Sequence, residues 1–195
     1  MKKLMLTFAA IAWHTFAVFA QPQWKSDQKQ SKLGFSVTSM GINEVHGLFK
    51  NFEATILSSK EDFSDAVFSL TVDAASIDTD IKRRDNDLRS DNFFDVENLP
   101  QITFRSTSIT KTGPNTYKLT GDLSMHGVTK VVSMDLLYKG TTQDPTTKAL
   151  TSGFQVTGTL KRSDFNIGRG FMASMVGDEV NINADGAFIS QYTNP

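Results

Sequence analysis

Hydrophobic and polar side chains alternate along most of the chain from residue 21 onward. In each short run every second residue is apolar, and Ser, Thr, Asn, Asp and Lys fill the positions between. Such a period of two is typical of antiparallel strands that bury one face in a core and expose the other to water. The alternating apolar positions are Leu33, Phe35, Val37, Phe52, Ala54, Ile56, Phe68, Leu70, Val72, Ile102, Phe104, Tyr117, Leu119, Leu123, Val132, Met134, Leu136, Tyr138, Phe154, Val156, Leu160, Val180, Ile182, Ala184 and Phe188.

The alternation changes parity once. Val45 and Phe49 stand at odd positions, whereas the next run begins at Phe52 and continues at even positions. A β-bulge or bend at Lys50 and Asn51 would join the two runs into one long strand with all its apolar side chains on one face. We therefore expect a single bent strand in this part of the chain.

Short turns separate the alternating runs. The turn residues are Gly41 with Asn43, Gly113-Pro114-Asn115, residues 140–145, and Gly177 with Asp178. Strands at this spacing favour either a β-sandwich or an up-and-down barrel. Because no pair of protected edge strands is evident, we predict an all-β antiparallel barrel of about eight strands.

Two segments do not follow the strand pattern. Residues 80–92 are dense in charge, and the pairs Asp80–Arg84 and Asp85–Arg89 have the i,i+4 spacing that supports an exposed helix. Each such pair contributes only a few tenths of a kcal/mol, so packing must also hold this helix. The glycines and methionines of residues 163–176 indicate a mobile loop or a short helix. We expect the helical segment of residues 80–92 to lie across one end of the barrel.

The first twenty residues have the pattern of a secretory signal peptide. Lys2 and Lys3 precede a short apolar run, and Val18 and Ala20 suit the −3 and −1 positions of a cleavage site. The run is too short for a stable membrane span. We therefore expect residues 1–20 to be removed and residues 21–195 to form a single domain outside the inner membrane, in the periplasm. An uncleaved anchor is the alternative.

Cysteine usage and charge exclude several classes of function. The chain has no cysteine, so thiolate catalysis, cysteine–zinc sites and disulfides are excluded. A secreted chain of this length buries an adequate core without disulfides. Without Lys2 and Lys3 it carries 18 basic and 21 acidic residues, a charge of about −3. That balance argues against nucleic acid as a partner, because nucleic-acid binding needs a basic face.

The sequence contains few candidate residues or motifs for catalysis or metal binding. His46 and His126 are the only histidines after residue 20, each precedes a glycine, and their spacing does not match a zinc motif. We interpret them as turn residues that bond nearby backbone. The chain contains no Gly-x-Ser-x-Gly elbow, no phosphate-binding glycine loop and no His-Glu-x-x-His helix. We expect no cofactor, no metal and no enzymatic activity.

An ordered set of residues from Trp24 to Asp178 resembles the YceI-like family of secreted, lipocalin-like barrels associated with polyisoprenoid binding. The set is Trp24, Asp27, Ser31, Phe35, Val37, Val45, Gly47, Phe49, Ser76-Ile77-Asp78-Thr79, Arg84-Asp85, Leu88, Phe93-Phe94-Asp95, Pro100, Ile102, Phe104, Gly121, Leu123, His126-Gly127-Val128-Thr129-Lys130, Arg162, Asp164-Phe165 and Val176-Gly177-Asp178. The chain departs from the family pattern at Gln30, where histidine is frequent, and at Asn166, where glycine is frequent. The resemblance implies a lipocalin-like barrel with an elongated apolar cavity, and it is compatible with a homodimer.

An eight-stranded barrel either fills its interior with side chains or encloses one small ligand. Alternation alone does not decide between the two, because large Phe side chains either close a core or form the wall of a slot. Combined with the resemblance, it predicts a cavity lined by Phe35, Val37, Phe52, Phe68, Leu70, Phe93, Phe94, Phe104, Leu119, Met134, Phe154, Val156, Val180 and Ile182. We expect one of the twin rings Phe93 and Phe94 to point inward and the other to pack under the helix.

Three polar residues are candidates for contact with the head group of a ligand. Arg84 and Asp85 fall on the family pattern, and an arginine fork suits a pyrophosphate. His126 is the third candidate, at a rim of the barrel. The alternative for the charges of residues 80–92 is a solvated helix face with internal pairing.

The prediction is therefore a secreted carrier or sequestering protein for a long-chain isoprenoid or other apolar lipid, without stable insertion into the membrane. A tail of about forty carbons at roughly 0.3 kcal/mol per atom would contribute about 12 kcal/mol, which corresponds to nanomolar binding. Two alternatives remain. One is a stress-response or interaction protein with a filled barrel, and the other is an enzyme that acts on a related lipid.

Overall fold

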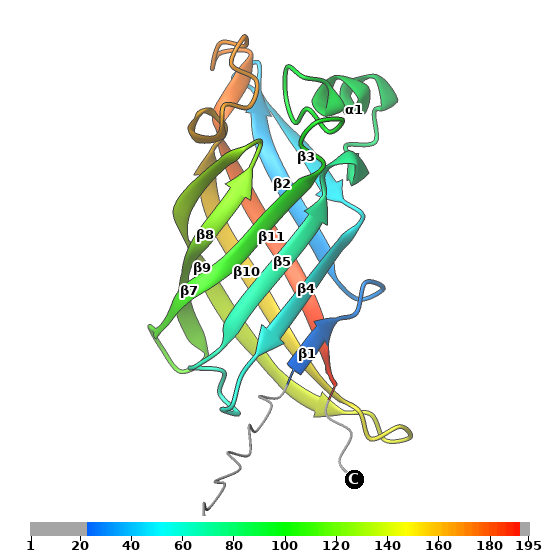
Figure 1. Ribbon diagram of the computed structural model, residues 1–195, viewed down its shortest axis with the longest axis vertical. Helices are drawn as coiled ribbons and strands as arrows, with labels where there is room; N and C mark the ends of the chain where they lie inside the picture. The colour runs from blue at the N-terminus through cyan, green and yellow to red at the C-terminus, as the bar shows by residue number, and fades with distance from the viewer. Residues whose placement is uncertain (1–22, 192–195) are drawn as a thin grey trace, which may run out of the picture.

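The computed structural model describes residues 23–191, so the predicted signal peptide of residues 1–20 lies outside the described residues. The described chain forms one 11-stranded antiparallel sheet that curls into a barrel (Figure 1). The strands are β1 Gln23–Ser26, β2 Lys32–Ser39, β3 Asn43–Phe49, β4 Phe52–Leu57, β5 Val67–Asp73, β6 Ile77–Asp78, β7 Gln101–Lys111, β8 Thr116–Met125, β9 Val128–Gln143, β10 Leu150–Lys161 and β11 Val176–Ser190. The helices are η1 Ala74–Ser76, α1 Lys82–Arg89 and η2 Arg162–Phe165.

The barrel closes as a ring of eight strands. The ring order is β1-β4-β5-β7-β8-β9-β10-β11, and β11 pairs back with β1. The three remaining strands extend strands of the ring. In chain order β2 follows β1, β3 precedes β4 and β6 follows β5. By pairing, β2 lies beside β11, β3 beside β2 and β6 beside β3. The prediction of an all-β antiparallel barrel of about eight strands is therefore confirmed.

The predicted bend at Lys50 and Asn51 is also confirmed. β3 ends at Phe49 and β4 begins at Phe52, so these two residues separate the two strands. β3 pairs with β2 and β4 pairs with β1, which shows that the bend divides one long strand into two paired halves. The parity change in the sequence marks this bend.

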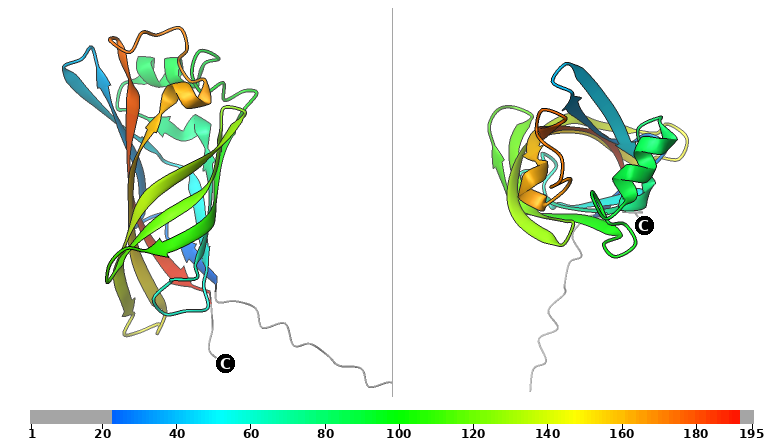
Figure 2. Two further views of the ribbon diagram at one scale, coloured as in Figure 1. Left: turned by 90° about the vertical axis from the view of Figure 1, so that its left-hand side faces the viewer. Right: turned by 90° about the horizontal axis from the view of Figure 1, so that it is seen from above.

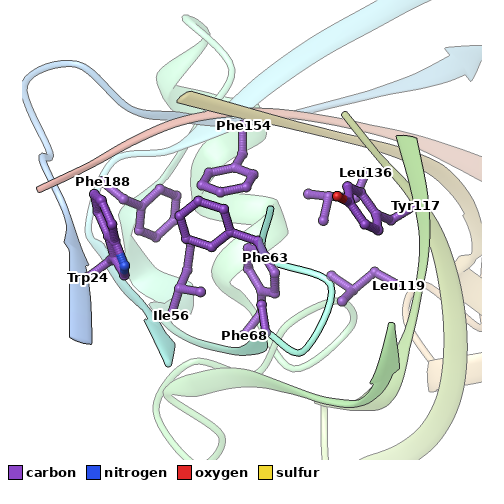
Figure 3. Packing of buried hydrophobic residues seen from close by; sticks show 10 residues of the cluster. Trp24, Ile56, Phe63, Phe68, Tyr117, Leu119, Leu136, Phe154 and Phe188 are labelled. Atoms are coloured by element: carbon purple, nitrogen blue, oxygen red, sulfur yellow. The ribbon is translucent and has the colours of Figure 1, made fainter. Parts of the chain in front are cut away.

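The core consists of two hydrophobic clusters, one toward each end of the barrel. The ends are called lower and upper as they are drawn in Figure 1, with β1 at the lower end and α1 at the upper end. The lower cluster contains Trp24, Ile56, Phe63, Ala66, Phe68, Tyr117, Leu119, Leu136, Phe154 and Phe188 (Figure 3). The upper cluster contains Val72, Ala74, Phe93, Ile102, Leu123, Phe165 and Ile167. Partly buried side chains such as Phe104 pack against both clusters, so the apolar lining is continuous along the barrel.

A loop of residues 58–66 closes the lower end of the barrel. It carries Phe63, whose side chain is 2% exposed and lies at the centre of the lower cluster in Figure 3. The Phe63 ring lies 5.3 Å from Trp24 and 5.0 Å from Phe154, both in edge-to-face contact. Phe63 has a φ of 58°, a left-handed conformation that is uncommon for a bulky residue. Packing of its ring therefore fixes the shape of the loop.

The helix α1 lies at the upper end, as predicted, beside the mouth of the ring, with η2 on the opposite side (Figure 2). The expected pairs Asp80–Arg84 and Asp85–Arg89 are wrong, because Arg84 and Asp85 bond Thr79 and Arg89 bonds backbone carbonyls. Arg89 donates to the carbonyl oxygens of Ala75, at 2.8 Å, and Ile77, at 2.6 Å. The arginine thus ties the helix to the barrel wall, which a short exposed helix needs because its local pairs are weak.

The segment of residues 163–176 forms η2 and an irregular loop, in agreement with the prediction of a loop or short helix. Asn166, with φ of 61°, and Gly168, with φ of 62°, take the left-handed conformation at the end of η2. Side chains of this segment, among them Phe165, Ile167 and Phe171, belong to the upper cluster or pack against it. The loop therefore covers part of the barrel's upper end.

Candidate ligand-binding cavity

An apolar cavity runs through the barrel between the two clusters. The cavity has a free volume of about 190 Å³. The lining consists of Ser26, Ser31, Lys32, Leu33, Gly34, Phe35, Phe49, Phe52, Ala54, Phe68, Ser69, Leu70, Val72, Ile102, Phe104, Leu119, Leu123, Met125, Val132, Met134, Phe154, Val156, Leu160, Ile182, Ala184, Asp185, Gly186 and Phe188. The barrel is thus not completely filled by its own side chains.

Most residues predicted from the alternation do line this cavity, because they stand on the inward face of their strands. They are Phe35, Phe52, Phe68, Leu70, Phe104, Leu119, Met134, Phe154, Val156 and Ile182. Phe49 and Phe52, on either side of the bend, both contribute to the lining despite their different parity. The bend therefore keeps one apolar face continuous around the ring.

Four predicted residues lie outside the lining. Val37 and Val180 are register partners at the upper end of β2 and β11, beyond the partners Phe35 and Ile182 that do line it. Phe93 packs on Phe171 at 4.9 Å between ring centroids, in the covering layer of the upper cluster.

Phe94 contacts the cavity residue Phe49 from above, at 5.7 Å between ring centroids. The twin rings therefore form part of the cover, one buried beside the loop and the other against the wall. Neither is a wall residue of the cavity itself, because the strand pattern has ended before this segment begins.

The sequence prediction left out several lining residues that obey the same period of two. They are Leu33, Ala54, Val72, Ile102, Leu123, Val132, Leu160, Ala184 and Phe188. A stricter use of the alternation would have found all of these. Phe63 is different, because it closes the lower end from a loop, and its local sequence carries no signal for that position.

Two serine side chains of the lining form hydrogen bonds to the strands around them. Ser26 Oγ accepts from Ala54 N at 3.0 Å. Ser31 Oγ accepts from Ala187 N at 3.1 Å and donates to the Ala187 carbonyl oxygen at 3.3 Å. These hydroxyls form hydrogen bonds to neighbouring strands at the junction where β1 ends and β2 begins. The cavity therefore presents hydrocarbon and aromatic surface, which suits an apolar ligand.

The three head-group candidates lie outside the cavity lining, and their polar atoms bond to the protein. Asp85 is 6% exposed, and its Oδ1 accepts from Thr79 N at 2.8 Å and from Thr79 Oγ1 at 2.6 Å. Arg84 Nε donates to Thr79 Oγ1 and Nη2 donates to the Thr79 carbonyl oxygen, each at 2.8 Å. Arg84 and Asp85 thus hold Thr79 between them and fasten the start of α1.

His126 occupies the two-residue turn between β8 and β9. Its φ of 50° and the φ of 71° at Gly127 match a type I′ turn. The His126 Nδ1 lies 3.0 Å from the carbonyl oxygen of Phe165, so the ring links this turn to η2. This geometry agrees with the interpretation of His126 as a turn residue bonded to backbone.

The interpretation of His46 as a turn residue is wrong, because His46 lies exposed within β3, with its Nε2 3.8 Å from a carboxylate oxygen of Glu44. Across residues 23–191, no group of three or more His, Asp or Glu side chains is placed to hold a metal ion. Within the same residues, no helix is both long and apolar enough to cross a membrane.

A closed eight-stranded antiparallel barrel around one apolar cavity defines the class of lipocalin-like ligand-binding barrels. The YceI-like domain matches residues 24–188 of this chain. The chain therefore belongs to the YceI-like family.

Individual relatives agree in length and in fold. The chain is 34% identical over 170 residues to Protein YceI of Salmonella agona, covering 86% of this chain and 88% of that protein. The crystal structure of Burkholderia cenocepacia BcnA has a TM-score of 0.73 and 27% identity, covering 83% of this chain and 98% of BcnA. A polyisoprenoid binding domain from Saccharophagus degradans has a TM-score of 0.65 at 16% identity, covering 86% and 98% of the two chains. That last likeness shows the fold alone.

Proposed function

We propose that the protein binds a long apolar molecule of the isoprenoid type inside its barrel and carries or sequesters it. The observation that carries this proposal is the cavity, which is continuous along the barrel and lined mainly by hydrocarbon and aromatic side chains. The Saccharophagus degradans domain of the same fold is described as polyisoprenoid binding, which supports this class of ligand. A filled barrel, the first alternative, does not leave such space.

The physical basis of binding would be burial of the tail. Transfer of apolar surface out of water contributes about 25 cal/mol per Å², and a drug-sized ligand gains about 0.3 kcal/mol per atom at best. Because the hydroxyl groups of Ser26 and Ser31 are bonded to the barrel wall, they do not oppose burial of an apolar tail. The tail would therefore supply most of the affinity, and any selection of a head group would occur at the mouth.

We also propose that the protein acts in the periplasm after removal of residues 1–20. The support is the sequence pattern, with two lysines ahead of a short apolar run and a small residue at position 20. The amino-terminal mass of the protein from the periplasmic fraction tests this. A mass that begins at residue 21 supports cleavage, whereas a mass that begins at Met1 contradicts it.

The ligand is best identified from the purified protein. Native mass spectrometry followed by organic extraction should show a co-purifying lipid with a long hydrocarbon tail. A clean mass of the protein alone, together with no uptake of added isoprenoid alcohols or quinones, would contradict the proposal.

A pair of variants on one strand makes this test specific. Ala184→Phe places a ring in the cavity, whereas Asn183→Phe places the same ring on the outer face of β11. We expect Ala184→Phe to reduce lipid uptake about tenfold or more, and Asn183→Phe to retain it. Equal uptake by both variants would place the ligand elsewhere. Conversion of the lipid to a new product during incubation would instead support the enzyme alternative.

A further inference from the structure

Exposed apolar side chains gather at the upper end of the barrel. Nine large hydrophobic side chains of the described residues are exposed, and five of them come from three segments at this end. They are Met40 at 63%, Ile42 at 84%, Ile81 at 50%, Met172 at 68% and Met175 at 42% exposure. We call these five residues the apolar rim. Single exposed apolar residues are ordinary, but a gathering on one end indicates an interaction surface.

The apolar rim is built from segments that are far apart in the sequence. Met40 and Ile42 lie in the turn between β2 and β3, Ile81 precedes α1, and the two other methionines lie in the loop after η2. Met40 N donates to the Met175 carbonyl oxygen at 3.0 Å, which joins the first and third segments. Figure 2 shows the turn, the helix and the loop around the same end of the barrel.

This end is also the better candidate for the mouth of the cavity. The lower cluster is sealed by Phe63, and only five partly buried hydrophobic residues pack against it. The upper cluster has thirteen such residues, among them Phe94 and Phe171 of the cover. Because the lower end is sealed, a ligand that enters or leaves would meet the upper cover and the apolar rim.

Within the three segments that hold the apolar rim, basic residues outnumber acidic ones. Its three segments, residues 39–43, 80–83 and 169–176, carry Lys82, Arg83 and Arg169 against the single acid Asp80. The whole chain, in contrast, has a formal net charge of −1. All three bases are exposed, and none takes part in an ion pair within residues 23–191. Basic residues near an apolar surface favour anionic lipid head groups by about 1 kcal/mol each.

We propose that the apolar rim docks this protein on the surface of a lipid bilayer that contains anionic lipid. The inference rests on the proposed function, because a long isoprenoid dissolves in the bilayer and must pass between membrane and cavity. Met and Ile side chains that project from turns and loops suit shallow insertion among acyl chains, with bases at the level of the phosphates.

Vesicle co-sedimentation tests this docking with the full processed protein. The probes are vesicles of phosphatidylethanolamine with phosphatidylglycerol, and vesicles of phosphatidylcholine alone. We expect the wild-type protein to bind the anionic vesicles, and the double variant Ile42→Asp/Met172→Asp to lose binding about tenfold for each substitution. Val131→Asp is the matched control. Val131 is 69% exposed, nearly the same fraction as Met172, but it lies on the side wall of the barrel in β9.

Lys82→Glu/Arg83→Glu should lower binding to the phosphatidylglycerol vesicles and leave the weak binding to phosphatidylcholine unchanged. The docking proposal is overturned if wild-type protein stays in the supernatant with both kinds of vesicle, or if Val131→Asp loses as much binding as the double variant. It is also overturned if Ile42→Asp turns a dimer into a monomer in light scattering without changing vesicle binding, because the rim would then be an interface between copies.

A separate measurement keeps this result distinct from the proposed function. Uptake of an isoprenoid offered from dilute dispersion, without vesicles, reports on the cavity alone. We expect the double variant to take up this ligand like the wild-type protein while it fails to bind vesicles. Vesicle binding without any uptake would overturn the proposed function, whereas uptake without vesicle binding would overturn only the docking.

Discussion

One buried arginine organises the loop at the upper end of the barrel. Arg162 is 8% exposed, and its guanidinium donates five hydrogen bonds, all to carbonyl oxygens. The acceptors are Ile167, Gly168, Phe171, Val176 and Gly177, at 2.7 to 3.1 Å. Five donors are the full capacity of an arginine side chain, so the cation is satisfied without a carboxylate among these partners. Arg162 thus holds the loop that carries Met172 and Met175 of the apolar rim.

Arg162→Lys should therefore destabilise the protein strongly. Lysine keeps the charge but lacks the planar fork, so at least two carbonyl bonds are lost. We expect the free energy of unfolding to fall by about 3 kcal/mol, measured by urea denaturation. Arg169→Lys is the control in the same loop, and because Arg169 is exposed its change should stay within about 0.5 kcal/mol. Similar losses for the two variants would contradict this role of Arg162.

At the scale of elements, the loop of residues 58–66 closes the lower end through polar contacts at its own turns. Asp65 accepts from Ser58 Oγ at 2.6 Å and from Ser59 N at 3.1 Å. Asp62 Oδ1 accepts from Ser64 N at 3.1 Å, and its Oδ2 accepts from Lys111 Nζ at 3.2 Å. These bonds hold the loop in the shape that places Phe63 in the core.

Tyr117 anchors the same loop from the barrel wall. It is 1% exposed and donates its hydroxyl to the carbonyl oxygen of Asp62. Burial raises the pKa of Tyr117, so the hydroxyl stays a donor at neutral and mildly basic pH. The closure thus combines an apolar ring with a buried hydrogen bond.

The closure should loosen in acid. Hydrogen bonds from Ser64, with the ion pair to Lys111, lower the pKa of Asp62 from 3.8 to about 2. A pKa that is lower in the folded state means that the carboxylate stabilises the loop above about 3.8 and loses that effect as the pH falls to about 2. Trp24 contacts Phe63 and is the only tryptophan after residue 20, so its emission should shift to longer wavelength over this interval.

Asp62→Asn should show a smaller shift over the same interval, because the titrating carboxylate is gone. Asp144→Asn is the matched control, since Asp144 also accepts bonds from its own loop, from Thr146 N at 2.8 Å and Thr147 N at 2.7 Å. That loop lies between β9 and β10. An unchanged Trp24 response in Asp62→Asn, or an equal loss in both variants, would contradict the assignment.

At the scale of the whole molecule, the barrel combines a closed ring of backbone hydrogen bonds with an incompletely filled interior. Closure removes exposed sheet edges from the ring, so the wall does not depend on the interior for its pairing. The interior retains about 190 Å³ of free space, lined chiefly by apolar side chains. A ligand that fills this space adds contacts to the folded state that the unfolded chain cannot form.

Removal of the bound lipid should therefore lower thermal stability. A ligand at about 100 times its Kd contributes about 2.7 kcal/mol, which corresponds to a Tm difference of roughly 5–10 °C for a domain of this size. Calorimetry before and after extraction of the lipid on a hydrophobic resin measures this difference. Ala184→Phe, whose cavity is occupied by the new ring, should show little change. A lipid-free protein with the same Tm as the loaded protein would contradict ligand binding in the cavity.

The amino-acid sequence by itself determined the strands, the ring of about eight and most of the cavity wall. The reason is that a period of two assigns each side chain to one face of its strand, whatever strand lies beside it. Even the bend at Lys50 and Asn51 was visible, because Phe49 and Phe52 break the parity. The same local rule does not extend to Phe93 and Phe94, which stand in the turns after α1 and pack in the cover.

Only the tertiary structure decided how the ends of the barrel are built. Phe63 reaches the core from a loop, and Arg84 and Asp85 meet at Thr79 rather than at a ligand. The apolar rim joins three segments that no local pattern connects. The placement of Phe63 and the assembly of the apolar rim depend on contacts between residues far apart in the chain, whose geometry follows from closure of the ring and not from neighbouring residues. The alternation determines which face of each strand points inward. Long-range packing determines which segments close each end of the barrel.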